Sequence, residues 1–229
     1  MSYFSEIDSF VVAFTGNAEA QARTVREMKR VGFKTVRTEW NFPNPYDKVL
    51  LRNMPHSGFF DKNIGFFNCA VTHYRIIKIA YELGLERAVI VEDDCRFRKD
   101  MYGLDSLPEA DLILLDSIPR KDYVHVPSEL PFVSFDVMRS SACYYVSKKC
   151  MERLIWLYES AADADIKHRK ARLSDQWFER KYLKGLSIVR ANPNIAVQQT
   201  QPTKRNSGNR WRLEGYAKLG IDLDNYAKF

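Results

Sequence analysis

Residues that mark fibrous, disordered or disulfide-rich proteins are scarce in this sequence. Its 229 residues include only 10 Gly, 9 Pro and 4 Cys, whereas 45% are hydrophobic and 13% are aromatic. This composition excludes collagen-like, low-complexity and wholly disordered chains. A chain of this length can bury roughly 70–75% of its unfolded surface, so its core needs no disulfide or metal. We therefore expect one globular domain over residues 1–229.

Long apolar runs are also missing. The longest, such as residues 88–91 and 112–115, fall far short of the roughly 18–20 residues that span a bilayer. The first eight residues carry two acids and no Lys or Arg, so they lack the cationic start of a secretory signal. We expect a protein of the reducing cytoplasm. The four cysteines form no C-x-x-C pair, which favours buried thiols over a zinc site or a disulfide framework.

Positive charge is concentrated in the second half of the chain. Residues 1–115 hold 15 Lys and Arg against 16 Asp and Glu, whereas residues 116–229 hold 20 against 13. A basic half suits a nucleic acid, an anionic membrane face or a phosphorylated ligand, and it also suits a plain solvated surface. Charge alone does not choose among these partners.

Apolar periodicity predicts alternating strands and helices. Strands are predicted at residues 10–14, 35–38, 87–91, 112–115, 142–146 and 186–189. Helices are predicted at residues 18–31, 68–83, 148–161 and 174–182, with Gly32 and Gly84 as C-terminal caps and Ser147 as an N-terminal cap. The strands without polar alternation are typical of a sheet covered on both faces. The pattern indicates an α/β architecture.

Two segments lack this periodicity. Residues 40–65 contain several prolines, glycines and aromatics, which favours a long loop able to close over a ligand. From Pro193 onward the chain is rich in Gln, Asn, Arg and Lys and has no clear core pattern. We expect residues 193–229 to form a flexible basic C-terminal segment.

The strongest chemical signal is an acidic triplet, Glu92, Asp93 and Asp94, directly after the apolar strand at residues 87–91. Adjacent carboxylates repel one another, and the carboxyl edge of an α/β sheet is where ligands bind. A hard divalent cation that bridges carboxylates and phosphate oxygens commonly neutralises such a cluster. Taken alone, the triplet favours a well-solvated acidic turn paired with Arg96, Arg98 and Lys99, because acidic triplets are common on protein surfaces.

The chain around this triplet resembles glycosyltransferase family 25. The features it shares are a Thr-His pair opening a helix at 72–73, a helix ending in Gly-Leu at 84–85, and the strand ending in Glu-Asp-Asp at 92–94. The tyrosine-containing strand that runs into a helix at 141–150 is similar to a second segment of the family. The Ser-Asp-Gln-Trp at 174–177 is similar to an acidic position before its last strands.

This resemblance covers about residues 65–200. It implies a GT-A fold, in which a Rossmann-like, mixed and mostly parallel sheet flanked by helices binds a nucleotide-sugar. It also implies that the acidic triplet is a D-x-D type motif. Asp94 and Glu92 would then hold Mn²⁺ or Mg²⁺, while Glu92, on the ribose side, and Asp93 would contact the donor.

Other candidate donor contacts follow from their positions in the chain. The turn Thr15-Gly16-Asn17 follows the first strand, which is a suitable place for a base or ribose. His73, at a helix start, can hydrogen-bond the sugar or the triplet, or serve as a structural histidine. Lys204 and Arg205 in the basic tail can help to hold the diphosphate, as can Arg210 and Arg212 further on, although each is equally a solvated terminal charge.

Sugar transfer also needs a group that deprotonates the acceptor hydroxyl. Our candidate is Asp175, at the start of a predicted helix, where an acid also complements the helix dipole. Asp116, after the strand at residues 112–115, and Asp136 are the other candidates. Either carboxylate could act as the base in a single displacement that inverts the configuration at the sugar.

We predict a metal-dependent, inverting glycosyltransferase. The resemblance implies galactosyltransferase-like transfer from a nucleotide-diphosphate sugar, which we expect to be a UDP-sugar, to a saccharide or other hydroxyl acceptor, in surface glycan or lipopolysaccharide biosynthesis. We expect no nucleic-acid partner and peripheral contact with an anionic membrane face on its inner side. The alternatives are a metal-dependent phosphoesterase or nucleotidyltransferase, a non-catalytic basic nucleic-acid-binding protein, and a non-catalytic sugar-binding relative.

Overall fold

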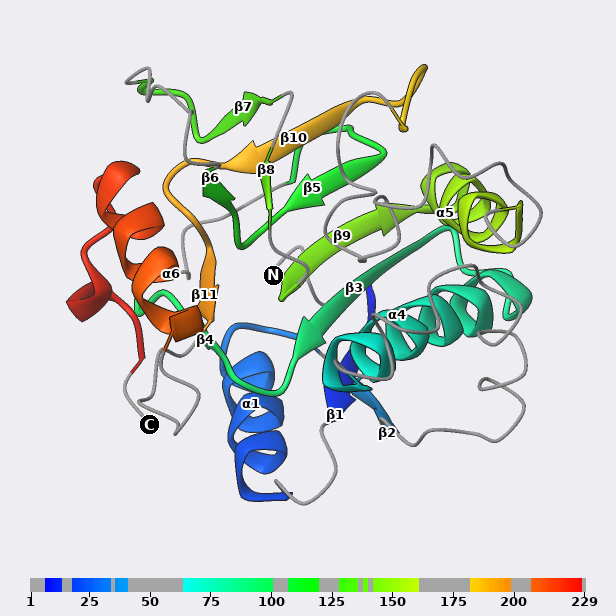
Figure 1. The fold of residues 1–229 in the computed structure, drawn as a ribbon, viewed down its shortest axis with the longest axis horizontal. Helices are drawn as coiled ribbons and strands as arrows, with labels where there is room; N and C mark the ends of the chain where they lie inside the picture. Colours follow the sequence, from blue (N-terminus) through cyan, green and yellow to red (C-terminus); the bar gives the residue numbers. More distant parts are fainter. Residues whose placement is uncertain are drawn as a thin grey trace.

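The structure of the protein is a computed structural model (Figure 1). It describes residues 7–13, 18–33, 36–40, 64–100, 107–119, 128–135, 138–139, 142–160, 182–198 and 207–227. The helices are α1 (Ala18–Arg30), α4 (Ile64–Glu82), α5 (Lys148–Ser160), α6 (Ser207–Lys218) and the 3-10 helix η5 (Leu223–Asn225). The strands are β1 (Asp8–Ala13), β2 (Val36–Trp40), β3 (Arg87–Glu92), β4 (Cys95–Phe97), β5 (Leu112–Leu114), β6 (Ile118–Pro119), β7 (Phe132–Ser134), β8 (Met138–Arg139), β9 (Cys143–Ser147), β10 (Ile188–Ala191) and β11 (Ala196–Gln198).

Seven strands form the central sheet, in the order β2-β1-β3-β9-β5-β10-β7. The pairs β1 with β2, β1 with β3, and β5 with β10 are parallel. Strand β9 is antiparallel to both of its neighbours, β3 and β5, and β7 is antiparallel to β10. Five of the seven strands therefore point the same way. The predicted α/β fold with a mixed, mostly parallel sheet is confirmed.

The two faces of the sheet are covered by different helices, and residues alternate between them. On β3, Ala88 and Ile90 belong to the core with α4 and α5, whereas Val89 and Val91 belong to the core with α1. Because side chains alternate across a strand, a strand that is apolar at every position must be buried on both faces. Strand β3 therefore lacks polar alternation because it is buried on both faces, as predicted.

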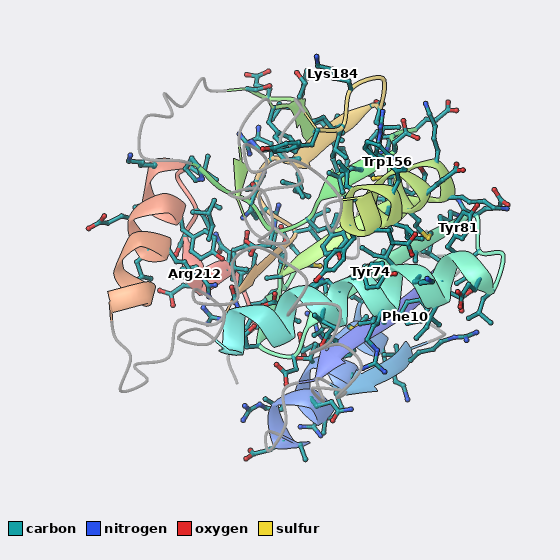
Figure 2. The ribbon with its side chains drawn as sticks, turned by 45° about the vertical axis from the view of Figure 1, so that its right-hand side comes forward. Phe10, Tyr74, Tyr81, Trp156, Lys184 and Arg212 are labelled. Carbon is teal, nitrogen blue, oxygen red and sulfur yellow. The ribbon has the colours of Figure 1, made fainter. Side chains whose placement is uncertain are left out.

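Helices α4 and α5 lie side by side on one face (Figure 1). Figure 2 shows Tyr74 at their contact, where its ring stacks on Tyr158 with centroids 4.3 Å apart. The Tyr74 hydroxyl donates to Glu159 at 2.7 Å, and Lys78 donates to the same carboxylate at 2.9 Å. These contacts fix the position of α4. Its middle residue is His73, so the Thr72-His73 pair lies in the middle of the helix and does not open it, contrary to the prediction.

Helix ends follow the predicted caps. Gly84 has a φ of +71°, its N–H donates to the Tyr81 carbonyl, and the Leu85 N–H donates to the Ala80 carbonyl. This is the hydrogen-bond pattern of a Schellman cap, which favours glycine. At the start of α5, the Cys150 N–H donates to Ser147 Oγ at 3.2 Å, as predicted. Helix α4 begins at residue 64, four residues before its predicted start, so residues 64–65 are not part of the predicted loop.

The C-terminal segment differs from its prediction. No core pattern was found after Pro193, yet β11 pairs with β4, and α6 packs against β6 (Figure 1). Tyr216 and Tyr226 are 1% and 2% exposed and belong to the core. Short strands and isolated aromatics leave too few apolar positions for a period to be recognised. Residues of this segment therefore belong to the core, contrary to the prediction.

Cys95, Cys143 and Cys150 are buried free thiols, as predicted. In the part of the chain described here, no helix has the length and apolar character required to cross a membrane.

The α6 contact with β6 leads to a stability prediction. A Cβ added at Gly215 would overlap Cγ2 of Ile118, a stiff β-branched side chain that is buried. Gly215→Ala should therefore lower the free energy of unfolding by about 1–2 kcal/mol, although alanine is the better helix former. Denaturant unfolding measures this change. The exposed Ala217→Gly measures helix propensity alone, and a stabilised Gly215→Ala would show that the contact is not tight.

Candidate functional site

The acidic triplet lies at the carboxyl end of β3, near the centre of the sheet. Glu92 ends the strand, and its N–H donates to the Ala142 carbonyl at 2.7 Å. The Asp93 N–H donates to the Val12 carbonyl of β1 at 3.1 Å, and the Asp93 carbonyl accepts a hydrogen bond from Thr24 of α1 at 2.7 Å. The turn is therefore held by backbone contacts to both sides, and its carboxylates have a fixed place at the sheet edge.

Glu92 points to the face covered by α4, because it has the same strand parity as Ala88 and Ile90. There it is 5% exposed and meets His73, which is 1% exposed, with 3.2 Å between Oε1 and Nε2. The other ring nitrogen of His73, Nδ1, lies 2.9 Å from the Tyr144 hydroxyl. Because an ionised carboxylate only accepts, Nε2–H donates to Glu92, and Nδ1 and the Tyr144 hydroxyl share the second hydrogen bond of the ring.

Gln198, at the end of β11, joins two members of the triplet. Its Nε2 donates to Glu92 Oε2 at 2.8 Å and to Asp94 Oδ2 at 3.0 Å. Both oxygens of Glu92 thus accept hydrogen bonds, one from α4 and one from β11. A carboxylate held on both sides in this way keeps one orientation.

Asp94 is the electrostatically strained member of the triplet. Its Oδ1 is buried without a hydrogen-bond partner. Burial, followed by the negative charge of Glu92, raises the pKa of Asp94 to about 8, while the positive charge of Arg212 and the Gln198 hydrogen bond act in the opposite direction. Arg212 lies on α6 (Figure 2). The pair of an unpartnered oxygen and a raised pKa marks a place where a bound cation would stabilise the ionised carboxylate.

The raised pKa predicts how stability depends on pH in metal-free buffer. Between an unfolded value of 3.8 and the folded value of about 8, the folded state retains a proton on Asp94 that the unfolded chain has lost. The free energy of unfolding should therefore fall as pH rises through this window. Urea unfolding at pH 5.5, 7 and 8.5 should show this fall in the wild type and a flatter profile in Asp94→Asn. Parallel profiles would show that Asp94 ionises as an ordinary carboxylate.

A second polar cluster surrounds Asp116, which follows β5. Asp116 is fully buried, and its Oδ1 accepts from the Tyr216 hydroxyl and from the Asn194 amide, each at 3.0 Å. The Tyr216 oxygen in turn accepts from the Gln198 N–H at 2.9 Å. Tyr216 of α6 therefore connects Asp116 to the residue that holds Glu92 and Asp94. Burial and the nearby Asp116 charge raise the Tyr216 pKa, so its hydroxyl stays protonated and donates.

The structure brings together some of the predicted residues. His73, Glu92 and Asp94 form one hydrogen-bonded group with Gln198, and Asp93 lies in the same turn. Asp116 joins this group through Tyr216, and its complete burial favours a structural role. Outside the described residues lie Thr15, Gly16, Asn17, Asp136, Asp175, Lys204, Arg205 and most of the predicted loop at 40–65.

Sequence reasoning did not identify Gln198 and Tyr216 as parts of the site. Gln198 follows the three-residue apolar stretch Ile195-Ala196-Val197, which is too short to predict a strand. Tyr216 follows Arg212 by four residues, a spacing that places both on one side of a helix. That spacing was the only available signal, and α6 carries too few apolar residues to be recognised as an amphipathic helix.

The donor set fits a divalent cation in one particular way. Within the described ranges, no group of three or more His, Cys, Asp and Glu side chains is arranged to hold a metal. Mg²⁺ and similar hard cations are commonly held by one or two carboxylates together with substrate phosphates and water. Asp94 Oδ1 supplies one such oxygen. The residues present therefore fit a cation that is shared with a diphosphate, and they do not fit a cation enclosed by protein.

Comparison with known proteins finds distant structural similarity to solved structures. No family profile and no curated protein matches the sequence. Among solved structures, the chain is similar to a glycosyltransferase involved in the glycosylation of the major capsid of PBCV-1. The two share 11% sequence identity at a TM-score of 0.46, over 90% of this chain and 98% of the other.

Proposed function

We propose that this protein is a glycosyltransferase that binds a nucleotide-diphosphate sugar at the carboxyl edge of its central sheet. The observation that carries the proposal is the buried, unpartnered Oδ1 of Asp94, in an acidic turn that follows a central strand and is influenced by a cationic side chain of α6. A diphosphate with its cation satisfies all three features at once. The resemblance of residues 65–200 to glycosyltransferase family 25 points to the same chemistry.

Each residue of the site has a role in this proposal. Asp94 holds Mn²⁺ or Mg²⁺, which when bound acts as a Lewis acid toward the diphosphate leaving group. Arg212 adds a second positive charge to the diphosphate side, where negative charge develops as the sugar leaves. His73 and Gln198 hold Glu92 in one orientation through hydrogen bonds. Gln198 also donates to Oδ2 of Asp94, whereas Oδ1 of Asp94 accepts no hydrogen bond and is left for the cation.

The base that activates the acceptor is proposed to be Asp175. Asp116 is less suited, since it is fully buried and already accepts hydrogen bonds from Tyr216 and Asn194. A base must come within hydrogen-bond reach of the acceptor hydroxyl. In the proposed single displacement the acceptor hydroxyl attacks the sugar directly while Asp175 takes up its proton, so the configuration at the sugar is inverted. We propose a UDP-sugar as donor and a saccharide as acceptor.

Turnover of nucleotide-sugars tests the proposal. The protein is incubated with a panel of UDP-, GDP-, CMP- and dTDP-sugars, with Mn²⁺ or with EDTA, and release of the nucleotide is measured. We expect slow metal-dependent release with one donor, because transferases hydrolyse donors slowly when no acceptor is present. Hydrolysis of a simple phosphodiester with no release from any sugar nucleotide would favour the phosphoesterase. Binding of a labelled oligonucleotide without either activity would favour the nucleic-acid-binding alternative.

A further inference from the structure

Arg96, in the middle of β4, is a cation that the site described above does not use. Three basic residues follow the acidic triplet, and two of them are bound to other groups. Arg98 donates to Asp100 at 2.8 Å, and Lys99 donates to the Asp224 carbonyl at 2.7 Å. Within the described ranges, the side chain of Arg96 makes no hydrogen bond and no ion pair, and its Nε is buried without a partner.

Burial without hydrogen bonds is unfavourable for a guanidinium. Burial lowers the pKa of Arg96 from its usual value, and the nearby Tyr216 and Asp224 act in the opposite direction. The side chain still stays charged, because the pKa of arginine is far above neutral pH. Its five N–H donors form a planar fork that matches phosphate oxygens. A phosphate group is therefore the kind of ligand that would satisfy Arg96.

Arg96 lies on the same side of the chain as Asp94, and solvent reaches both. Residues 93, 95 and 97 are buried, whereas residues 94, 96 and 98 are partly exposed. Alternate residues of an extended chain point to one face, and two residues span about 7 Å. A ligand at Asp94 can therefore extend along this partly exposed face to Arg96 without entering the core.

Helix α6 lies beside this face of the chain. Strand β11 pairs with β4, and the Gln198 N–H at its end donates to the Tyr216 hydroxyl at 2.9 Å. Tyr216 is close enough to Arg96 to act on the pKa of its guanidinium. One helical turn earlier, Arg212 acts in the same way on Asp94. A single turn of α6 therefore runs alongside both Asp94 and Arg96.

The site thus offers a carboxylate oxygen for a cation and a separate guanidinium further along the chain. In the proposed function, the cation at Asp94 holds one phosphate, and the phosphate joined to it needs a partner of its own. We propose that Arg96 binds this second phosphate of the donor, an inference that rests on the proposed glycosyltransferase function. Arg96 then makes the site selective for diphosphates, so that sugar donors with a single phosphate, such as CMP-sugars, bind weakly.

Calorimetric titration with inorganic pyrophosphate and with inorganic phosphate, both in Mg²⁺, tests this proposal. Pyrophosphate carries the diphosphate without a base, so the test does not depend on which nucleotide the donor contains. The proteins are wild type, Arg96→Met and Arg96→Lys. Arg98→Met is the matched control, because it makes the same change two residues further along, at a side chain already paired with Asp100. Thermal unfolding of each variant confirms that it is folded.

We expect the wild type to bind pyrophosphate more tightly than phosphate. Arg96→Met should weaken pyrophosphate binding by about 10–100-fold and leave phosphate binding unchanged, because it removes a charged hydrogen-bond donor from one phosphate only. Arg96→Lys should lose less, since it keeps the charge without the planar fork, and Arg98→Met should match the wild type. Equal pyrophosphate affinity in wild type and Arg96→Met, an equal loss for both anions, or no binding of pyrophosphate to the wild type would overturn the proposal.

The two proposals fail in different ways. Pyrophosphate binding that depends on Arg96, without turnover of any sugar nucleotide, would retain the diphosphate site and contradict the transferase. Turnover of a sugar nucleotide with the same KM in wild type and Arg96→Met would retain the transferase and contradict the role of Arg96.

Discussion

Asp94→Asn is expected to lower kcat/KM for metal-dependent nucleotide-sugar turnover by about 10²–10³-fold, equivalent to about 2.7–4 kcal/mol of transition-state stabilisation. The substitution keeps the shape of the side chain but replaces Oδ1 or Oδ2 with an amide and removes the charge that holds the cation. Gln198 Nε2 would also lose a carboxylate acceptor at 3.0 Å. Initial rates with and without Mn²⁺, measured on the donor that the wild type uses, give the effect directly.

The control for this change is Asp100→Asn, which removes a carboxylate from an exposed surface position paired with Arg98. It should retain wild-type kinetics. Loss of folding cannot explain an inactive Asp94→Asn, because removal of a buried carboxylate with a raised pKa should make the metal-free protein more stable near pH 8. A variant with normal metal-dependent turnover would show that the cation is held elsewhere.

Tyr216→Phe is expected to destabilise the protein by about 2–4 kcal/mol and to reduce activity as well. The missing hydroxyl leaves the buried Asp116 carboxylate without one donor and the Gln198 N–H without its acceptor. Each unsatisfied buried group costs about 1–3 kcal/mol. Because Gln198 orients Glu92 and Asp94, its displacement should raise KM for the donor and its metal. Denaturant unfolding and donor kinetics measure the two effects.

Tyr74→Phe is the matched control, because it removes a hydroxyl that donates to Glu159 at the α4 and α5 contact. That surface hydrogen bond should contribute less than about 1 kcal/mol, with no effect on KM. If Tyr216→Phe is no more destabilising than Tyr74→Phe, the link from α6 to the acidic triplet does not hold the site. If it is destabilising but leaves KM unchanged, the link is structural only.

The central sheet could be predicted because its strands carry strong local signals. Residues 88–91 and 112–115 are apolar at every position, which requires cover on both faces, and caps such as Gly84 mark helix ends. The antiparallel placement of β9 between β3 and β5 could not be read in the same way. Strand order depends on contacts between distant segments, and periodicity reports only which face of an element is buried.

The part of the site that could be predicted from the sequence is the turn with three consecutive acidic residues, 92–94. Three consecutive acids after a buried strand indicated a ligand edge without any knowledge of tertiary contacts. Gln198 reaches that edge from more than a hundred residues further along the chain, through a strand of three residues. From the sequence alone, Arg190 would be predicted to lie at the protein surface, because arginine is rarely buried. Its burial appears only once β10 is placed between β5 and β7.

The most direct test of the proposed donor site is calorimetric titration of the purified protein with UDP and with the nucleotide of the best donor. The titration is performed with Mn²⁺ and again with EDTA, on wild type and on Asp94→Asn. A metal-coupled site at Asp94 predicts binding of one nucleotide to the wild type in the presence of Mn²⁺, and little or no binding in EDTA or in the variant. Equal binding in all four cases, or binding of no nucleotide to the wild type with Mn²⁺, would contradict a donor site at the acidic triplet.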